Sequence, residues 1–314
     1  MANTVLSDLV VPEVFTPYMI EQTSVKSAVL NSGIVRNVTG AAGIVDMGGH
    51  EIKMPSFEDL TGDDSVAAAD GTALVPGKIG TQTMVVPVLN RERAFSANAL
   101  AGAMAGTNPI QAIGSLISSY RARQLQKAVI NTLDGAMAAV TANVSDITAS
   151  SGAASKFNAE TFLDAQYKLG DHFDKLGAVM VHSATKKKME KDNLIDFSRD
   201  SDGNEMVTYR GKPVIVDDGL TVSSGDYTSY IIGMGALNFA ELSVPNAFET
   251  YREELENNDG LIQRRRYALS IPGVSYTGTL DGTTPTNAAL ATSGNWTLVY
   301  EAQNVPVVQF IHKL

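Results

Sequence analysis

The chain has 314 residues, enough for one large domain or two smaller ones, and 44% of them are hydrophobic, which can fill a substantial core. Its formal net charge of -10 argues against sequence-independent nucleic-acid binding, because such binding neutralises phosphates with Lys and Arg. There is no cysteine, which excludes disulfides and thiolate metal sites, and no apolar run approaches the ~20 residues that span a bilayer.

Only 18% of the residues are charged. This favours a protein that buries much of its surface against copies of itself, although a large core gives the same composition. The first residues carry no basic segment ahead of their apolar positions, so the sequence predicts no secretory signal and a cytoplasm-like compartment.

Residues 1–48 have the pattern of an arm. Pro12 and Pro17 interrupt the early part, and residues 18–30 favour a short helix with its apolar side chains roughly on one side. A segment that cannot build its own core packs on something else. We therefore expect this arm to lie either on a neighbouring molecule or on its own domain.

Residues 49–97 have the pattern of a long β-hairpin. Ile52, Met54 and Phe57 predict one strand, and a Val- and Thr-rich stretch over residues 81–90 predicts another. An acidic connection rich in Gly and Ala separates them. Because an isolated two-stranded ribbon is only marginally stable, the hairpin is expected either to rest on a neighbour or to be a mobile surface feature.

The longest predicted helix covers residues 109–140. Asn108 is a favourable N-cap, and Pro109 suits the first helical position. Apolar residues of the two halves fall on roughly opposite sides of the helix, namely Ile110, Ile113, Ile117 and Tyr120 against Val129, Leu133, Met137 and Val140. The halves are expected to pack against different elements, unless the segment is a kinked or broken helix pair.

A compact α/β unit follows. Residues 141–157 predict a polar surface loop, and Asn158 caps a helix over residues 159–169. An apolar strand over residues 178–181 leads to a helix over residues 184–191, with Ser183 as its expected N-cap. A polar loop and a strand over residues 213–216 complete the unit, which ends at Asp217 and Asp218.

The last third of the chain is rich in strand signals. A strand is predicted over residues 227–232, and residues 249–254 and 260–270 predict an antiparallel pair. Asp259-Gly260, a strong hairpin signal, places the turn of that pair at residues 256–260. Residues 277–295 predict a loop. The final strand, over residues 305–311, is expected to add to a sheet formed earlier in the chain.

No pattern identifies a catalytic or metal site. The histidines lack the i, i+4 spacing of a helical zinc site, so they are interpreted as surface or structural residues: His50, His172, His182 and His312. His182-Ser183 beside Asp217 and Asp218 is the best hydrolase candidate, but the G-x-S-x-G elbow is absent.

Three further motifs are interpreted as structural. The stretch around Asp200 and Asp202 lacks the flanking acids of a calcium loop, and Gly233-Met234-Gly235 lacks the third glycine of a dinucleotide motif. Lys186, Lys187 and Lys188 are expected on a solvated helix face. With no Walker loop either, the sequence predicts no cofactor and no metal.

A family resemblance gives these elements an order. The sequence VMVHSATKKKMEKDNLIDF (residues 179–197), followed by TYRGKPVIVDD (residues 208–218), resembles the axial domain of tailed-phage major capsid proteins of the Hong Kong 97 fold. The resemblance continues through residues 230–236 and 265–267 and reaches residues 285–287 and 295–296. No single motif is diagnostic, but their order over most of the chain is fairly specific.

The resemblance implies an α+β, Hong Kong 97-like capsid fold. Its implied parts are an N-terminal arm (1–48), an extended β-hairpin loop (49–97), a peripheral domain with the spine helix at about 109–140 (98–150), an axial domain (151–225), a return through axial and peripheral strands (226–290) and a C-terminal strand rejoining the axial domain (291–314). The implied function is structural, not enzymatic. The subunit would self-assemble through pentamers and hexamers into an icosahedral shell around double-stranded DNA, in the virion and assembled in the cytoplasm of a bacterial host.

The resemblance also implies the partners. These are copies of the same chain, packaged DNA bound without sequence specificity, a portal protein and a decoration protein, with no membrane partner. Because Met1 leads almost directly into the arm, the scaffolding protein is expected to be a separate chain. An encapsulin-type compartment shell is the first alternative, and an α+β hydrolase is the second.

Ten charged residues are candidate contacts between subunits. Glu58, Asp59 and Lys78 flank the hairpin connection, Arg91 and Arg93 lie at its base, and the predicted strand pair carries Glu253, Glu254, Arg264, Arg265 and Arg266. The acids and bases of the pair are expected to meet either within one chain or between subunits. Exposed ion pairs contribute little stability, so their expected role is in register and partner choice. No covalent cross-link from Lys78 is predicted.

Overall fold

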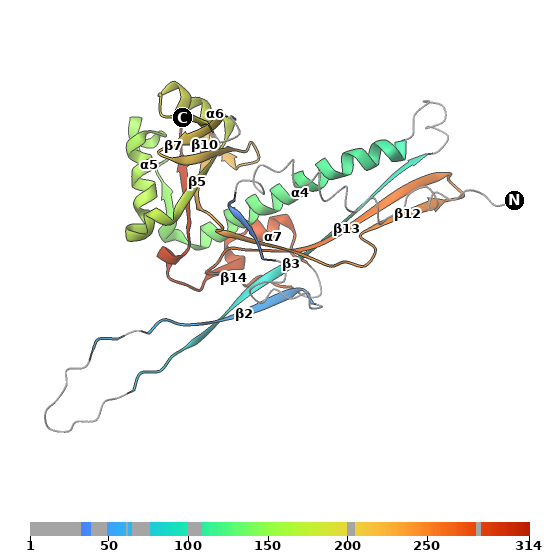
Figure 1. Ribbon diagram of the computed structural model, residues 1–314, viewed down its shortest axis with the longest axis horizontal. Helices are drawn as coiled ribbons and strands as arrows, with labels where there is room; N and C mark the ends of the chain where they lie inside the picture. Colours follow the sequence, from blue (N-terminus) through green and yellow to red (C-terminus); the bar gives the residue numbers. More distant parts are fainter. Residues whose placement is uncertain are drawn as a thin grey trace.

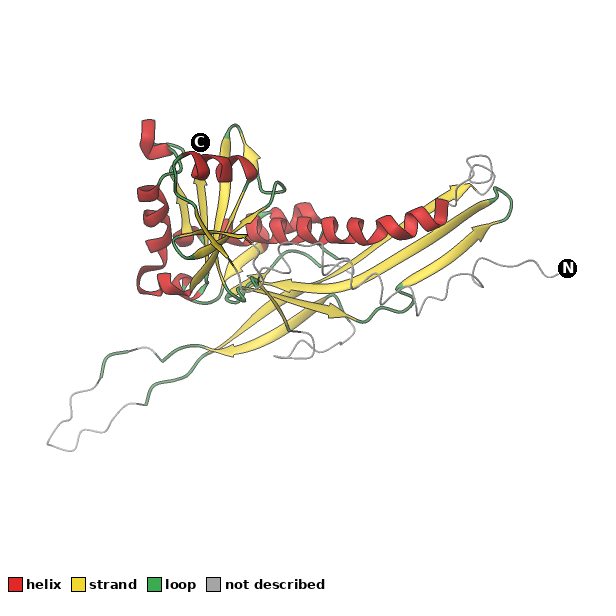
Figure 2. Ribbon diagram, turned by 45° about the horizontal axis from the view of Figure 1, so that its top comes forward, coloured by secondary structure: helices red, strands yellow, loops and turns green. Residues whose placement is uncertain are grey.

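The computed structural model describes residues 33–38, 49–60, 62–64, 76–98, 109–199, 205–280 and 284–314. The predicted helix over residues 18–30, the polar loop at residues 200–204 and most of the predicted arm lie outside these residues. Helices and two large sheets are present together, so the predicted α+β class is confirmed (Figure 2).

The first sheet has six strands and is organised around β13 (Asn258–Ser270). One edge of β13 pairs with β3 along most of its length, and the other pairs first with β12 and then with β11, all antiparallel. The remaining strands of this sheet are β1 (Val35–Asn37), β2 (Glu51–Phe57), β3 (Thr81–Asn98), β11 (Leu237–Leu242) and β12 (Phe248–Glu253).

Strand β3 confirms the predicted hairpin and extends it. Its residues 81–87 pair with β2, whereas residues 88–98 pair with β13, so the strand runs eight residues beyond the predicted end at Asn90. Met84, Val86 and Val88 are buried and pack with the half-buried Ile52 and Met54 of β2. From this packed base, β2 and the first part of β3 leave the body as a two-stranded ribbon (Figure 1).

Helix α4 (Pro109–Ala139) lies along this sheet, as Figure 1 shows. Ile117, in its first half, packs with Phe248 and Leu261 of the strand pair β12–β13. Leu133 and Met137, in its second half, belong to the main core. The prediction that the two halves pack against different elements is therefore confirmed, and the helix is one continuous element.

The second sheet has eight strands in the order β4-β16-β10-β5-β8-β7-β6, with β9 added to β10. The predicted C-terminal strand is confirmed as β16, which lies inside the sheet between β4 and β10. The strands are β4 (Val144–Asp146), β5 (Leu176–Val181), β6 (Asp196–Arg199), β7 (Glu205–Tyr209), β8 (Lys212–Val216), β9 (Val222–Ser223), β10 (Asp226–Gly233) and β16 (Val307–His312).

This sheet is buried on both faces, which explains the unbroken apolar run in β5. Ala178 and Met180 face the main core beside α4, whereas Val179 and Val181 face a second core. Helices α5 (Ala159–Gln166) and α6 (Ser183–Lys191) contribute Phe162 and Met189 to that second core.

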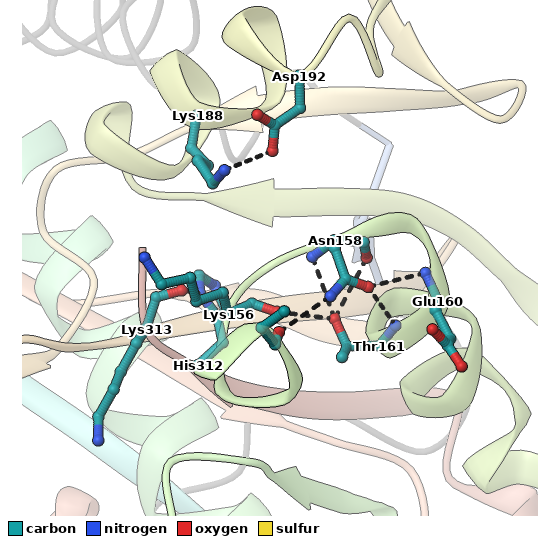
Figure 3. Close-up of polar contacts among 9 residues, drawn as sticks. Lys156, Asn158, Glu160, Thr161, Lys188, Asp192, His312 and Lys313 are labelled. Carbon is teal, nitrogen blue, oxygen red and sulfur yellow. Dashed lines mark hydrogen bonds and ion pairs between the residues drawn. The ribbon is translucent and has the colours of Figure 1, made fainter. Parts of the chain in front are cut away.

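Asn158 begins α5 as predicted. Its side-chain oxygen accepts from the backbone N–H groups of Glu160 and Thr161, and the Thr161 hydroxyl accepts from the backbone N–H of Asn158 (Figure 3). The helix ends at Gln166, three residues before its predicted end, and the chain continues as a tighter 3-10 segment with Gly170 at φ 57°. The 3-10 segments are η2 (Thr141–Asn143), η3 (Gly152–Ser155), η4 (Tyr167–Lys175), η5 (Ser293–Asn295) and η6 (Ala302–Asn304).

Two predicted loops contain regular structure and are corrected. Residues 144–146 form β4, which pairs with β16. This stretch lies in a short polar sequence that carries no strand signal. Residues 277–295 contain α7 (Asn287–Ala291), which packs on α4. They connect β14 (Val274–Tyr276) to β15 (Trp296–Leu298), and these two strands pair as a small antiparallel sheet.

Candidate assembly surfaces

The outer end of the ribbon carries exposed apolar side chains. Phe57 is 74% exposed, Leu60 77% and Ile79 51%. Phe57 is the strand partner of Thr81, and the backbone N–H of Glu58 donates to the carbonyl of Gly80. The two strands of the ribbon therefore end opposite each other. Three large apolar groups held this far from the body make a surface suited to burial against another molecule.

Three of the predicted contact residues lie at this same end. Glu58 and Asp59 follow β2, and Lys78 lies shortly before β3; all three are exposed. The ribbon therefore presents charge of both signs next to its apolar side chains. Residues 65–75 of the connection lie outside the described residues.

The arginines of β3 and β13 lie side by side. The register places Arg265 opposite Arg91 and Arg264 opposite Glu92. Arg264 Nη1 donates to Glu249 Oε2 at 2.8 Å, and its Nε lies 3.6 Å from Glu92 Oε2. Arg93 is exposed one step further along β3.

Arg265 and Arg266, which follow Arg264 in β13, also have partners in the chain. Arg265 Nε donates to Glu241 Oε1 at 3.0 Å, and Arg266 Nη2 donates to the carbonyl of Gly49 at 2.9 Å. The partners of Arg264 and Arg265 are thus Glu92, Glu241 and Glu249. For Glu253 and Glu254, the alternative of ion pairs with these arginines within one chain is wrong, because the register pairs Glu253 with Asn258, six residues before Arg264 on β13.

The turn between β12 and β13 differs from the prediction. It consists of residues 254–257, with Asn257 at φ 52°, and Asp259-Gly260 lies inside β13. Asn257 supplies the left-handed conformation that Asp-Gly was expected to supply. Glu253, Glu254 and the fully exposed Leu255 (101%) form the tip of this hairpin.

The hydrolase candidate is a helix-capping arrangement. His182, not Ser183, is the N-cap of α6, and its Nδ1 accepts from the backbone N–H of Ala184 at 3.1 Å. Asp218 Oδ1 accepts from the backbone N–H of Ser183 at 3.0 Å, and hydrogen bonds from the Ser183 side chain and backbone lower the pKa of Asp218. His182 Nε2 lies 3.7 Å from Asp218 Oδ1, but Nδ1 of this histidine is occupied by the helix cap, and the histidine makes no hydrogen bond to the Ser183 hydroxyl of the kind that activates a nucleophile.

The remaining chemical candidates have structural surroundings. Lys186 and Lys188 lie 3.5 Å from Glu190 and 2.6 Å from Asp192, one helical turn further on, as expected for a solvated face. Across the described ranges, no group of three or more His, Asp or Glu side chains is placed to hold a metal ion. None of the helices in those ranges is long and apolar enough to cross a membrane.

Sequence reasoning missed Arg121, a buried arginine of α4. Its Nη2 lies 3.6 Å from Glu241 Oε1, and its guanidinium lies 5.2 Å from the centre of the Phe248 ring. Arg121 stands four residues after Ile117 and four before Leu125, both buried. A charged residue inside a buried i, i+4 stripe was the signal that could have identified it.

Comparison with known proteins decides what this architecture is. The model of the family described as major capsid protein 13-like matches residues 81–304. A major capsid protein of Bacillus phage SPP1 is 39% identical over 323 residues, covering 100% of this chain and 99% of the relative. The chain belongs to this family of phage major capsid proteins.

Solved structures share the fold at low sequence identity. A capsid subunit of cyanophage Pam1 covers 92% of this chain and 92% of its own, with a TM-score of 0.58 and 10% identity. The capsid of a native GTA particle covers 91% and 90%, with a TM-score of 0.55 and 12% identity. An encapsulin from Synechococcus elongatus covers 74% and 77%, with a TM-score of 0.51 and 8% identity.

These findings confirm the predicted Hong Kong 97-like fold and the predicted function as a capsid shell protein of a tailed phage. The capsid protein is therefore a structural component of a virion and assembles with copies of itself. The encapsulin shares the fold alone, whereas the full-length relative identifies the capsid family.

Proposed function

We propose that this capsid protein forms pentamers and hexamers of an icosahedral shell that encloses double-stranded DNA, with the ribbon of each subunit lying on a neighbour. The observation that carries the proposal is the exposed apolar set Phe57, Leu60 and Ile79 at the outer end of the ribbon. Burying such side chains gains roughly 25 cal/mol per Å² of apolar surface. The net charge of -10 suits a shell that encloses DNA without binding it tightly.

The subunit divides, in this proposal, along the parts that the sequence predicted. Residues 98–150, with α4, and the β12–β13 pair make a peripheral domain. Residues 151–225 and 291–314 make the axial domain, and residues 226–290 return through strands of both domains, the β12–β13 pair among them. Residues 1–48 form the arm, and residues 49–97 form the extended loop. The two-sheet arrangement supports this division, because β16 returns to the sheet of β5 and β10.

The predicted contact residues take two roles in this proposal. The first role is contact with neighbouring subunits by exposed side chains. These are Glu58, Asp59 and Lys78 on the ribbon and Glu253 and Glu254 at the tip of the β12–β13 hairpin. Five arginines lie at the base of the ribbon and present positive charge to a neighbouring subunit packed there: Arg91, Arg93, Arg264, Arg265 and Arg266.

The finer partners are part of the same proposal. They are a separate scaffolding protein, a portal protein, a decoration protein and DNA packaged without sequence specificity, with assembly in the cytoplasm of a bacterial host. We assign the subunit no catalytic role and no cofactor. The role of His182 supports this, because the histidine caps α6 and is not hydrogen-bonded to the Ser183 hydroxyl.

The ribbon end is tested by deleting residues 58–78. The deletion leaves Ile79-Gly80 between the paired residues Phe57 and Thr81, which is a two-residue hairpin loop, and adding Ile79→Asn makes it Asn-Gly, a favoured type I′ turn. The shortened subunit is expected to fold with an unchanged circular dichroism spectrum and to form no closed shells in electron micrographs.

A full-length variant carrying Glu58→Gln and Asp59→Asn is the matched control, because it keeps the reach and the apolar side chains of the ribbon. We expect it to form shells with altered salt dependence. Shells of normal size and yield from the deletion variant would refute the proposed role. The nucleic-acid content of particles formed in a phage infection distinguishes a DNA-filled virion from a protein-filled compartment.

A further inference from the structure

A small cavity lies between α4 and the strands β3 and β13. Its volume is about 80 Å³, which is room for roughly five water-sized groups. It lies at the base of the ribbon, where β3 changes its partner from β2 to β13. The lining includes Arg91, Tyr120, Arg121, Gln124, Gln263 and Arg265.

The charges around this cavity do not balance. Arg121 and Arg265 share one carboxylate oxygen, Glu241 Oε1, at 3.6 and 3.0 Å. Arg91 donates to uncharged acceptors, the carbonyl of Pro285 at 2.6 Å and the side-chain oxygens of Thr284 and Asn287 at 3.4 and 3.3 Å. Three guanidinium groups and one carboxylate leave an excess of two positive charges.

Two other charged residues line the cavity and do not remove this excess. Glu92 is exposed, lies 3.6 Å from Arg264 and adds a second carboxylate to the count. Arg93 is exposed and adds a further cation. Four guanidinium groups and two carboxylates, Glu92 and Glu241, then leave the same excess of two positive charges.

Arg121 has an unused donor here. The residue is 8% exposed, and its Nε has no hydrogen-bond partner among the residues that the structure describes. Burial is the main cause that lowers the pKa of Arg121 to about 10, the charge of Arg265 lowers it further, and Glu241 opposes both. A buried, unpaired guanidinium N–H is costly, and an added anion would satisfy it.

We propose that this cavity binds one oxyanion group, either a carboxylate or a phosphate, held by Arg91, Arg121 and Arg265. Guanidinium groups match the planar carboxylate and the phosphate oxygens, and bonds between charged groups are about twice as strong as neutral ones. The cavity is too small for a nucleotide, so the group comes either from a free ion or from an acidic side chain of a second copy of the chain. The second source rests on the function proposed above.

Phosphate binding is tested on the unassembled subunit, so the result does not depend on shell formation. We expect sodium phosphate to raise the melting temperature by about 4 °C over sodium chloride of equal ionic strength, once phosphate reaches about 100 times its Kd. Isothermal titration calorimetry with phosphate should give one site per subunit. Equal melting temperatures in the two salts would overturn the proposal.

The variant Gln124→Glu adds a carboxylate to the lining. It should melt higher than the wild type in chloride and lose the increase that phosphate gives. Gln126→Glu is the matched control: it makes the same charge change on the same helix, outside the cavity, and should keep the full phosphate increase. Equal behaviour of the two variants would contradict the site.

A second variant and an assembly measurement complete the test. Arg91→Gln removes a lining cation whose bonds are to uncharged acceptors, and it should weaken phosphate binding about tenfold in the same titration, whatever its own stability. If a neighbour supplies the anion, Gln124→Glu will bind no phosphate and will also assemble poorly. If a free ion supplies it, that variant will assemble normally without phosphate. A wild-type phosphate affinity in Arg91→Gln would overturn the assignment.

Discussion

His312 illustrates how one residue is fixed by its surroundings. The residue is fully buried, and its ring lies 5.0 Å from that of Phe157. Its Nε2 lies 2.9 Å from the Ser229 hydroxyl, and its Nδ1 lies 3.1 Å from the carbonyl of Lys313. A carbonyl can only accept, so Nδ1 carries the proton and Nε2 accepts from Ser229. This is a neutral imidazole that uses both nitrogens.

Burial is the main cause that lowers the pKa of His312 to about 4, and the bond to Lys313 opposes it. The unfolded chain, with a histidine pKa near 6.5, binds the proton more readily, so this residue's contribution is complete above about pH 6.5 and is lost as the pH falls towards 4. We expect the loss to reach about 3 kcal/mol. It is measured by urea unfolding of the unassembled subunit at pH 7.0, 5.5 and 4.5.

His312→Gln is the comparison for this prediction, because an amide can also donate to Lys313 and accept from Ser229. It should be less stable at pH 7 and should lose less stability on acidification than the wild type, since it has no imidazole to protonate. Carboxylates titrate in both proteins, so only the difference between the two pH profiles counts. Parallel profiles would show that His312 does not control acid stability.

At the same scale, sequence reasoning gave roles to some residues and misplaced others. Asn158 was assigned correctly because an N-cap needs only local sequence. Ser183 was misassigned by one position: His182 can also accept from a helix N–H, and Asp218, which is distant in sequence, takes the Ser183 N–H instead. The partners of Arg264 and Arg265 depended on strand register, which the local charge pattern does not contain.

The contact of α7 with α4 is a feature of the element scale. Gly135 of α4 faces α7, and a Cβ atom there would lie 2.7 Å from Trp296 Nε1 and closer still to the Leu290 carbonyl oxygen. These two atoms are themselves hydrogen-bonded at 2.7 Å. The glycine, which weakens an isolated helix, is therefore what allows the two helices to approach.

Replacing Gly135 with Ala should reverse the usual effect of this substitution. In an open helix the change stabilises by roughly 1 kcal/mol, but here the methyl group overlaps backbone atoms of α7, so we expect a loss of about 1–3 kcal/mol. Gly294→Ala is the control, since a Cβ there meets no atom within 4 Å, and should change stability by less than about 0.5 kcal/mol. Urea unfolding measures both. A more stable Gly135→Ala protein would contradict this packing.

Elements with a periodic pattern or an apolar run were predictable, and elements without such a signal were not. The 31-residue α4 and the strands β5, β8, β10 and β16 follow from periodicity and apolar runs. Helix α7 has five residues and is formed by packing on α4 through Leu290, not by propensity. β4 has three residues and forms only because β16 offers it an edge.

At the scale of the whole molecule, the two sheets share one core. The main cluster combines Met180, Tyr230 and Val307 of the second sheet with Leu89 and Leu269 of the first. The pairing of β3 with β13 joins segments more than 150 residues apart, and no local signal predicts it. The family resemblance implied that residues 226–290 return through axial and peripheral strands, but it did not specify this pairing.

A polar contact reinforces that shared core. Asp134 of α4 accepts from the Tyr230 hydroxyl on β10 and from the Thr221 hydroxyl at 2.7 Å. Burial, followed by the charge of Asp134, raises the pKa of Tyr230 well above its usual value, so the hydroxyl stays protonated and remains a donor. These hydrogen bonds therefore join α4, which lies along the first sheet, to the second sheet.

We therefore expect the unassembled subunit to unfold as one unit, although its two sheets correspond to two proposed domains. Trp296, the only tryptophan, is buried in the shared core, so its fluorescence should follow the same urea curve as the far-ultraviolet circular dichroism of the whole chain. Asp134→Ala should move both curves to lower urea together, because it removes a partner from two donors. Curves that separate, in the wild type or in this variant, would mean that the second sheet unfolds independently of α4. Coincident curves would mean that α4 and the shared core couple the two sheets into one cooperative unit.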